Sequence, residues 1–414
     1  MFFFFFVVIG FINIIIHGIK FSFKNPFTFI LIWWYILPIA SQFELTDLYI
    51  PDDKLFLILI LFHFGLFLGS IIVKKKKEID EIKGVVYPLK VNILLKYLFY
   101  SVLGVQLLLA KRAVSVFLEY GFLGYRSLTF SSETNEGVLF SNPYLEILYG
   151  LICSPFTLFT LFFGAHIFYR NKSSTWILRS VLLLTLDSFI RLGRFNFYFI
   201  IIVLLFTFRK NIFPKLKLKK YVILLIIIPF SISILRDNST IRIVAKSLVE
   251  YHIVGFNLFT KAYMDKDSRL NNNLSYGMGT LGGVDYISTL IIRRFSPKYD
   301  SNYSYIVKNH HLPVETGYNK EYNFRIYHNA FYTILFTLYS DFKYIGVFFI
   351  PFLLSFIGHN NYQKFKNKAC LWSYTKYIII FFILYFSVFQ SYLQSHIVFL
   401  TMLFLLYISR YEKS

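Results

Sequence analysis

Two arginines and an aspartate stand in the short segment DSFIRLGRFNF, residues 187–197, between two runs that are almost entirely apolar. Asp187 precedes Arg191 by four residues, so the two can pair along one face of a helix. This pairing leaves Arg194 without a partner. A guanidinium group presents a planar fork of donors that matches the oxygens of a phosphate. The segment therefore predicts either a local ion pair at a helix end or a contact with a phosphate-bearing ligand.

Further basic residues stand at the ends of other apolar runs. Arg236 directly follows one run, Lys111 and Arg112 follow another, and Arg126 lies in the polar stretch GYRSL. Taken singly, each of these cations can be explained by contact with lipid headgroups. As a set, they are a group of cations that could bind a polyanion such as a diphosphate. Arg191, Arg194 and Arg236 are the first candidates, and Arg126 is the second.

A proton acceptor is the other group that such chemistry requires. His328 in YHNAF is the favoured candidate base, because an imidazole titrates near neutral pH. The alternative interpretation is an interfacial histidine that is hydrogen-bonded to a loop. His252 in EYHIVGF, with Glu250 close to it in sequence, is the second candidate base.

The composition indicates what kind of molecule must position these residues. Of the 414 residues, 56% are hydrophobic and only 16% are charged, whereas soluble domains are about one quarter charged. Apolar stretches long enough to cross a bilayer follow one another along the chain. The predicted fold class is therefore all-α, a polytopic helical membrane protein. The net charge of +21 comes mostly from loop lysines, so a nucleic-acid partner is not expected.

The apolar runs predict about eleven membrane spans, with roughly ten to twelve possible. The runs are 2–19, 27–41, 55–73, 91–110, 144–169, 175–190, 195–208, 220–235, 343–358, 376–390 and 395–409. A shorter apolar piece, 329–339, predicts a re-entrant or interfacial helix followed by a turn at SDFKYIG.

The basic loops set the predicted orientation. Lysine and arginine concentrate after the first, third, fifth, seventh and ninth runs and in the tail RYEKS. Because cytoplasmic loops are enriched in these residues, the N-terminus is predicted outside and the C-terminus inside. The chain then divides into an N-terminal bundle of about eight spans, an extracytoplasmic loop and a C-terminal part. Their bounds are 1–235, with an outer loop at 111–142, then 236–328 and 329–414.

Three blocks, in this order around the long loop, carry a resemblance to a known family. They are IRLGRFNFYFIIIVLLFTF (190–208), LRDNS (235–239) and YHNAFYTILFTLYSDFKYIGVF (327–348). The pattern resembles the Wzy-type O-antigen or oligosaccharide repeat-unit polymerases of bacterial envelopes. In the last block, Lys343 stands where that family usually has glycine in the turn.

The resemblance implies a membrane glycosyltransferase at the outer face of the bacterial cytoplasmic (inner) membrane. Its substrates would be glycans linked to undecaprenyl pyrophosphate, in the biosynthesis of O-antigen lipopolysaccharide or a capsule-like polysaccharide. The partners would be membrane lipids, with a chain-length regulator and a flippase as further candidates. No Asp-x-Asp pair stands in a soluble nucleotide-binding domain, and no glycine-rich phosphate loop follows a predicted strand, so neither a metal nor a nucleotide cofactor is expected. The alternatives are an O-antigen ligase and a lipid-linked oligosaccharide flippase.

Overall fold

A computed structural model gives the fold of most of the chain. It describes residues 1–78, 84–130, 139–140, 143–191, 193, 195–208, 241–308, 310, 312–320, 323–329 and 332–413. The described part is mostly helical, and five of its helices are long and apolar enough to cross a membrane. The chain is therefore a helical membrane protein.

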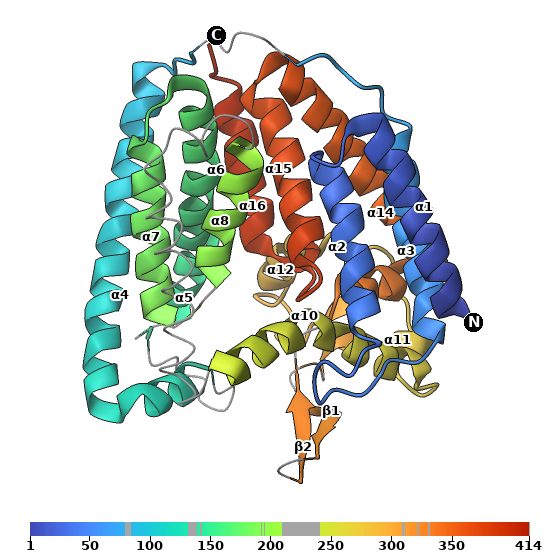
Figure 1. Cartoon of the computed structure of the whole chain (residues 1–414). Coiled ribbons are helices and arrows are strands. Elements are labelled where there is room, and N and C mark those ends of the chain that lie inside the picture. Colours follow the sequence, from blue (N-terminus) through green and yellow to red (C-terminus); the bar gives the residue numbers. More distant parts are fainter. Residues whose placement is uncertain are drawn as a thin grey trace. The chain divides into compact units, whose positions relative to one another are not determined.

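The described residues up to Phe208 form nine helical elements, most of them labelled in Figure 1. They are α1 (Phe2–Phe21), α2 (Pro26–Ala40), α3 (Lys54–Ile71), α4 (Leu89–Phe130), α5 (Pro143–Leu148), the π-helix η1 (Tyr149–Cys153), α6 (Ser154–Asn171), α7 (Thr175–Arg191) and α8 (Phe195–Phe208). The predicted apolar runs coincide with these helices to within a few residues, except in α4. The predicted run 220–235 lies outside the described residues.

The second half contains shorter elements before its long helices. They are α10 (Ile241–Met264), α11 (Arg269–Asn272), α12 (Gly282–Ile292), α13 (Asn302–Val307), strands β1 (Val314–Asn319) and β2 (Phe324–His328), α14 (Ile334–Lys368), α15 (Leu371–Phe386), the 3₁₀ turn η2 (Tyr392–Gln394) and α16 (His396–Ser409). The described residues of the long loop predicted at 236–328 thus form four helices and a two-stranded hairpin, joined by turns.

Residue contacts divide the chain into two compact units. Unit 1 contains Met1–Glu78, Ala245–Lys368 and Lys376–Phe399; unit 2 contains Ile79–Val244, Ala369–Thr375 and Leu400–Ser414. This division differs from the predicted one, because the segment after Ala245 packs with the first three helices. The loop and the N-terminal helices thus share one core.

Close helix packing forms the centre of unit 1, where α1, α2, α3 and α14 lie side by side (Figure 1). The sequence GLFLG places Gly65 and Gly69 on one face of α3. A Cβ atom at either position would collide with a carbonyl oxygen of α14, that of Phe348 or of Phe352. Small residues four apart allow two membrane helices to approach closely. The two glycines therefore explain why α3 and α14 pack so tightly.

A sharp turn divides α14 into two helical parts. Phe342 and Lys343 have non-helical backbone angles, and Lys343 has a φ of 52°. The first part is fully buried, and its Leu338 carbonyl packs against Gly346 beyond the turn. The predicted turn at SDFKYIG is confirmed, but the helix before it begins at Ile334 and not at residue 329; its re-entrant or interfacial placement stays a prediction.

Asp341, at the end of the buried part of α14, holds a distant loop in place. Its two carboxylate oxygens accept hydrogen bonds from Ser275 Oγ (2.5 Å), Gly279 N (2.9 Å), Thr280 N (2.7 Å) and Thr280 Oγ1 (2.6 Å). A buried carboxylate is tolerated when its oxygens are satisfied in this way. Asp341 therefore fixes the loop between α11 and α12 against α14.

The hairpin of β1 and β2 was not predicted. Its strands are antiparallel, with Val314 opposite His328 and Asn319 opposite Phe324. A backbone bridge between Leu48 and Gly317 connects the hairpin to the segment before α3. Strand β1 is thus the strand of the hairpin that contacts the segment before α3.

Helix α4 is longer than the apolar run from which it was predicted. The run ends at residue 110, which predicted an outer loop from Lys111 to Asn142, but the helix continues to Phe130 with a kink at Gly121. Cationic side chains at a helix surface can extend towards water, so Lys111 and Arg112 do not end the helix. The first part of the predicted loop is corrected to helix.

Candidate functional site

The predicted pairing of Asp187 with Arg191 is confirmed at the C-terminal end of α7, in unit 2. Arg191 Nε lies 3.2 Å from Asp187 Oδ1, with the spacing of one helical turn. The Arg191 side chain is 41% exposed and that of Asp187 is 14% exposed. Asp187 therefore lies largely inside the protein, whereas Arg191 reaches its surface.

A π-helical turn brings two more side chains to this pair. Tyr149 OH donates a 2.6 Å hydrogen bond to Asp187 Oδ1, and Arg191 Nη2 donates to Ser154 Oγ at 3.1 Å. Residues five apart on a regular α-helix point about 140° away from each other. In η1 the Ser154 amide instead bonds to the Tyr149 carbonyl, which is the wider turn of a π-helix. The π-helix thus places Tyr149 and Ser154 on the same side.

Two amides complete the cluster. Asn196 Nδ2, from the first turn of α8, donates to Asp187 Oδ2 at 2.8 Å. Gln106 Nε2, from α4, donates to Thr157 Oγ1 at 3.1 Å and lies 3.5 Å from the Tyr149 hydroxyl. No donor from the described part of the chain reaches Gln106 Oε1, although this atom is buried. The cluster therefore retains one buried acceptor to which no described group donates.

The arrangement fixes the Arg191 guanidinium without enclosing it. Asp187 and Ser154 hold two of its nitrogens, and its carbon lies 5.1 Å from the centroid of the Tyr149 ring. An arginine held in one geometry loses less entropy when it binds a ligand. Its exposed part can bind an anion such as a phosphate oxygen.

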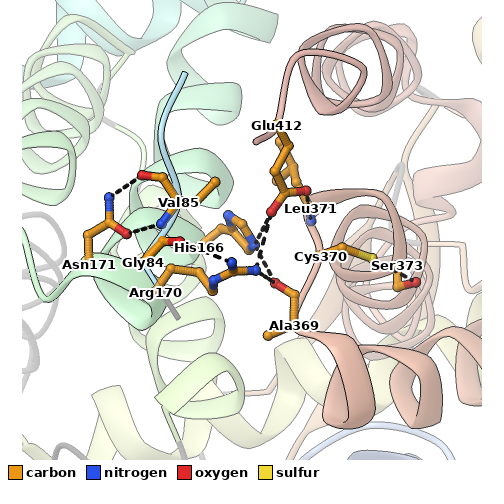
Figure 2. Close-up of polar contacts among 10 residues, drawn as sticks. All are labelled: Gly84, Val85, His166, Arg170, Asn171, Ala369, Cys370, Leu371, Ser373 and Glu412. Atoms are coloured by element: carbon orange, nitrogen blue, oxygen red, sulfur yellow. Dashed lines mark hydrogen bonds and ion pairs between the residues drawn. The ribbon is translucent and has the colours of Figure 1, made fainter. Parts of the chain in front are cut away.

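Another arginine of unit 2, Arg170, is buried and has a different character (Figure 2). Arg170 donates to the carbonyls of Ala369 (2.7 Å) and Gly84 (3.4 Å), and it pairs with Glu412 at 3.4 Å. Glu412 also accepts from the amide of Leu371 at 2.7 Å. With a side chain only 4% exposed, Arg170 joins chain segments to one another. We therefore assign it a structural role.

The other predicted cations are described only in part. Arg194 and Arg236 lie outside the described residues. Arg126 lies in the part of α4 beyond the kink at Gly121, where the structure describes the backbone. Of the four predicted arginines, Arg191 is thus the one whose surroundings are known.

His328 lies on β2, in unit 1. The Thr316 hydroxyl donates to the Ile326 carbonyl (3.3 Å), so its oxygen can accept from Nδ1–H of His328, 2.6 Å away. This tautomer leaves the lone pair on Nε2, where a base requires it. Partial burial lowers the pKa of His328 below its ordinary value, which favours the neutral form.

His252 lies among aromatic rings on α10. Its ring centroid is 5.5 Å from that of Trp33 and 4.5 Å from that of Phe389, both with edge-to-face geometry. This environment is typical of a packed histidine. His328 therefore remains the better candidate base.

Tyr149, Ser154, Asn196 and Gln106 were not among the predicted site residues. A polar side chain in an apolar run was the available signal, but such residues also form ordinary helix-to-helix hydrogen bonds. A π-turn has no clear sequence pattern, so the convergence of Tyr149 and Ser154 could not be predicted.

Comparisons with family models, with curated proteins and with solved structures found no match. The described residues contain no group of three or more His, Cys, Asp or Glu side chains that could hold a metal ion. The fold and the site thus define a helical membrane protein with an oriented, partly exposed arginine at the end of one helix.

Proposed function

We propose that the protein polymerises undecaprenyl-pyrophosphate-linked oligosaccharide repeat units into an O-antigen or capsule-like polysaccharide. The reaction would take place at the outer face of the bacterial cytoplasmic membrane. This proposal includes about eleven spans, an N-terminus outside and a C-terminus inside. It is supported by the order of the family-like blocks and by the chemistry available at Arg191.

The proposed reaction is a glycosyl transfer between two lipid-linked glycans. A sugar hydroxyl of the acceptor attacks the anomeric carbon of the donor, and the bond from this carbon to the diphosphate breaks. The hydroxyl proton passes to a base, for which His328 is the candidate and His252 the alternative. Negative charge grows on the departing diphosphate, and fixed guanidinium groups stabilise it. Arg191, Arg194, Arg236 and Arg126 are the candidates for that role.

One observation carries the proposal furthest. Arg191 is oriented by Asp187, Ser154 and the Tyr149 ring, yet its side chain remains 41% exposed. A purely structural arginine, such as Arg170, is enclosed by its partners. An arginine that is held but open fits the recognition of an anion.

Deleting the gene tests the overall activity. The expected result is surface glycan with a single repeat unit in place of a ladder of chain lengths, seen by gel electrophoresis. An unchanged ladder would contradict the polymerase proposal. Loss of all glycan, including single units, would instead favour the ligase or the flippase.

Substitutions test the role of the cations. Arg191→Ala, Arg194→Ala and Arg236→Ala are each expected to abolish chain extension while the protein still inserts into the membrane. Arg191→Lys keeps the charge but loses the planar fork, so an intermediate loss is expected. Arg179→Ala is the matched control, because Arg179 lies on the same helix and contacts the rings of Phe99 and Trp176. Normal ladders from all three alanine variants would remove the diphosphate role.

A further inference from the structure

The short helix α12 has one face that is apolar and exposed. Large apolar side chains recur with helical spacing from its first turn to the turn that follows it, and each is between 36% and 87% exposed. They are Leu281, Val284, Ile291, Ile292 and Phe295. At about 100° per residue these five positions fall within an arc of about 100°. We call this set the α12 stripe.

The opposite face of α12 is fixed by packing within unit 1. A Cβ atom on Gly282 would collide with Gln394, and one on Gly283 would collide with Phe399. The ring of Tyr286 stacks on that of His396, with centroids 4.0 Å apart and an interplanar angle of 11°. These contacts fix the rotation of the helix about its axis. The α12 stripe therefore faces outward because the other face is held.

Two polar residues on or beside the stripe, Ser288 and Asp285, are hydrogen-bonded within the protein. Ser288 lies between the apolar positions, and its hydroxyl donates to the Asp285 carbonyl at 3.0 Å. The Asp285 carboxylate accepts from Ser301 Oγ at 2.7 Å. The side chains of the stripe therefore have no hydrogen-bonding groups to offer to water. A face of this kind is stable against an apolar partner.

Basic residues follow the stripe at the C-terminal end of α12. Arg293 is oriented by Asp300, at 2.5 Å, and by the Tyr299 carbonyl, at 2.9 Å. Arg294 and Lys298 are exposed. An apolar stripe with cationic residues beside it is the pattern of a helix that lies in a bilayer interface. The cations there match the charge of phosphate headgroups.

The position of α12 supports lipid as the occupant of this surface. The helix packs on η2 and on the first residues of α16, and α16 is itself an apolar helix and a predicted membrane span. We propose that the α12 stripe inserts into the acyl boundary of the bilayer and that the arginines beside it contact lipid phosphates. The helix would then anchor the segment between α10 and α14 to the membrane surface. This inference does not depend on the polymerase proposal.

Spin labelling of the full-length protein in phosphatidylcholine–phosphatidylglycerol liposomes tests the inference. The background carries Cys153→Ala and Cys370→Ser, and single labels are placed at Ile291→Cys and, as an independent second site, at Val284→Cys. Lys266→Cys is the control, since Lys266 is exposed in the turn after α10. The measurement is the collision rate with oxygen, which partitions into lipid, and with a water-soluble nickel chelate.

The expected result is a severalfold higher ratio of oxygen to nickel collisions at Ile291 and Val284 than at Lys266. Equal ratios at the three sites would place the stripe in water and overturn the inference. Protection of both stripe labels from both reagents would also overturn it, because another protein surface would then cover the stripe. Because no enzyme activity is measured, the result is independent of the proposed function.

Discussion

The hydroxyl of Tyr149 donates a 2.6 Å hydrogen bond to Asp187, which forms the ion pair with Arg191. Tyr149 is buried at the start of a π-turn, and the Arg191 guanidinium lies over its ring. The position of Arg191 therefore depends on a residue on another helix. Side chains in such a network are coupled, and losing one affects the others.

Tyr149→Phe should weaken chain extension without removing the protein from the membrane. The substitution keeps the ring beside Arg191 but removes the hydrogen bond to a charged carboxylate, which contributes about 1.5 kcal/mol or more. If that energy is lost in the transition state, the rate falls about tenfold. The rate of chain extension in reconstituted vesicles is the measurement.

The control for this substitution is Tyr97→Phe, at an exposed tyrosine on α4. It changes the same atoms at a surface position and should leave the rate unaltered. Equal rates for Tyr149→Phe and the unsubstituted protein would mean that Arg191 needs no support from Tyr149.

The pKa of His328 predicts the pH dependence of both stability and activity. Burial lowers the pKa of this imidazole from its ordinary value of 6.5, so below about pH 6.5 the unfolded chain binds more protons than the folded protein. The free energy of unfolding should therefore fall as the pH drops below this value. With its pKa lowered, His328 stays neutral in the folded protein down to a lower pH than an unperturbed histidine does. This matters for activity if His328 is the base. The acidic limb of the pH–rate profile should then lie below pH 6.5.

Two variants separate catalysis from structure at this position. His328→Gln should abolish most chain extension and remove the acidic limb from the activity that remains. Thr316→Val removes the partner of Nδ1, so we expect a lower rate with the acidic limb retained. An unchanged acidic limb in His328→Gln would assign the titration to another group.

The sequence alone was sufficient to predict contacts that depend on local spacing. The interval of four residues predicted the pair of Asp187 and Arg191, and the apolar run 195–208 coincides with α8. Contacts between distant segments could not be predicted. Asp341 holds the loop at Thr280, and Thr316 meets His328 only because a hairpin forms. Neither the pairing of two short strands nor a hydrogen bond between a buried carboxylate and a distant loop produces a periodic sequence pattern from which it could be predicted.

The turn at Lys343 yields a prediction about stability. Its φ of 52° lies in the region that glycine adopts without strain, and a side chain there costs about 1 kcal/mol or more. The ammonium group compensates in part, because it donates to the carbonyls of Leu270 and Asn273. Lys343→Ala loses these bonds and keeps the strain, whereas Lys343→Gly loses both. Lys343→Gly should therefore be more stable than Lys343→Ala by about 1 kcal/mol.

Thermal unfolding of the three proteins in detergent measures this difference. Because both variants lack the ammonium group, their comparison isolates the backbone conformation from the two hydrogen bonds. Comparing the midpoint of the unsubstituted protein with that of Lys343→Gly then tells whether the two hydrogen bonds of the ammonium group outweigh the backbone strain. Equal midpoints for the alanine and glycine variants would mean that the turn relaxes when lysine is removed, and that residue 343 no longer holds a positive φ. A midpoint for the alanine variant above that of the glycine variant would contradict the assigned backbone geometry.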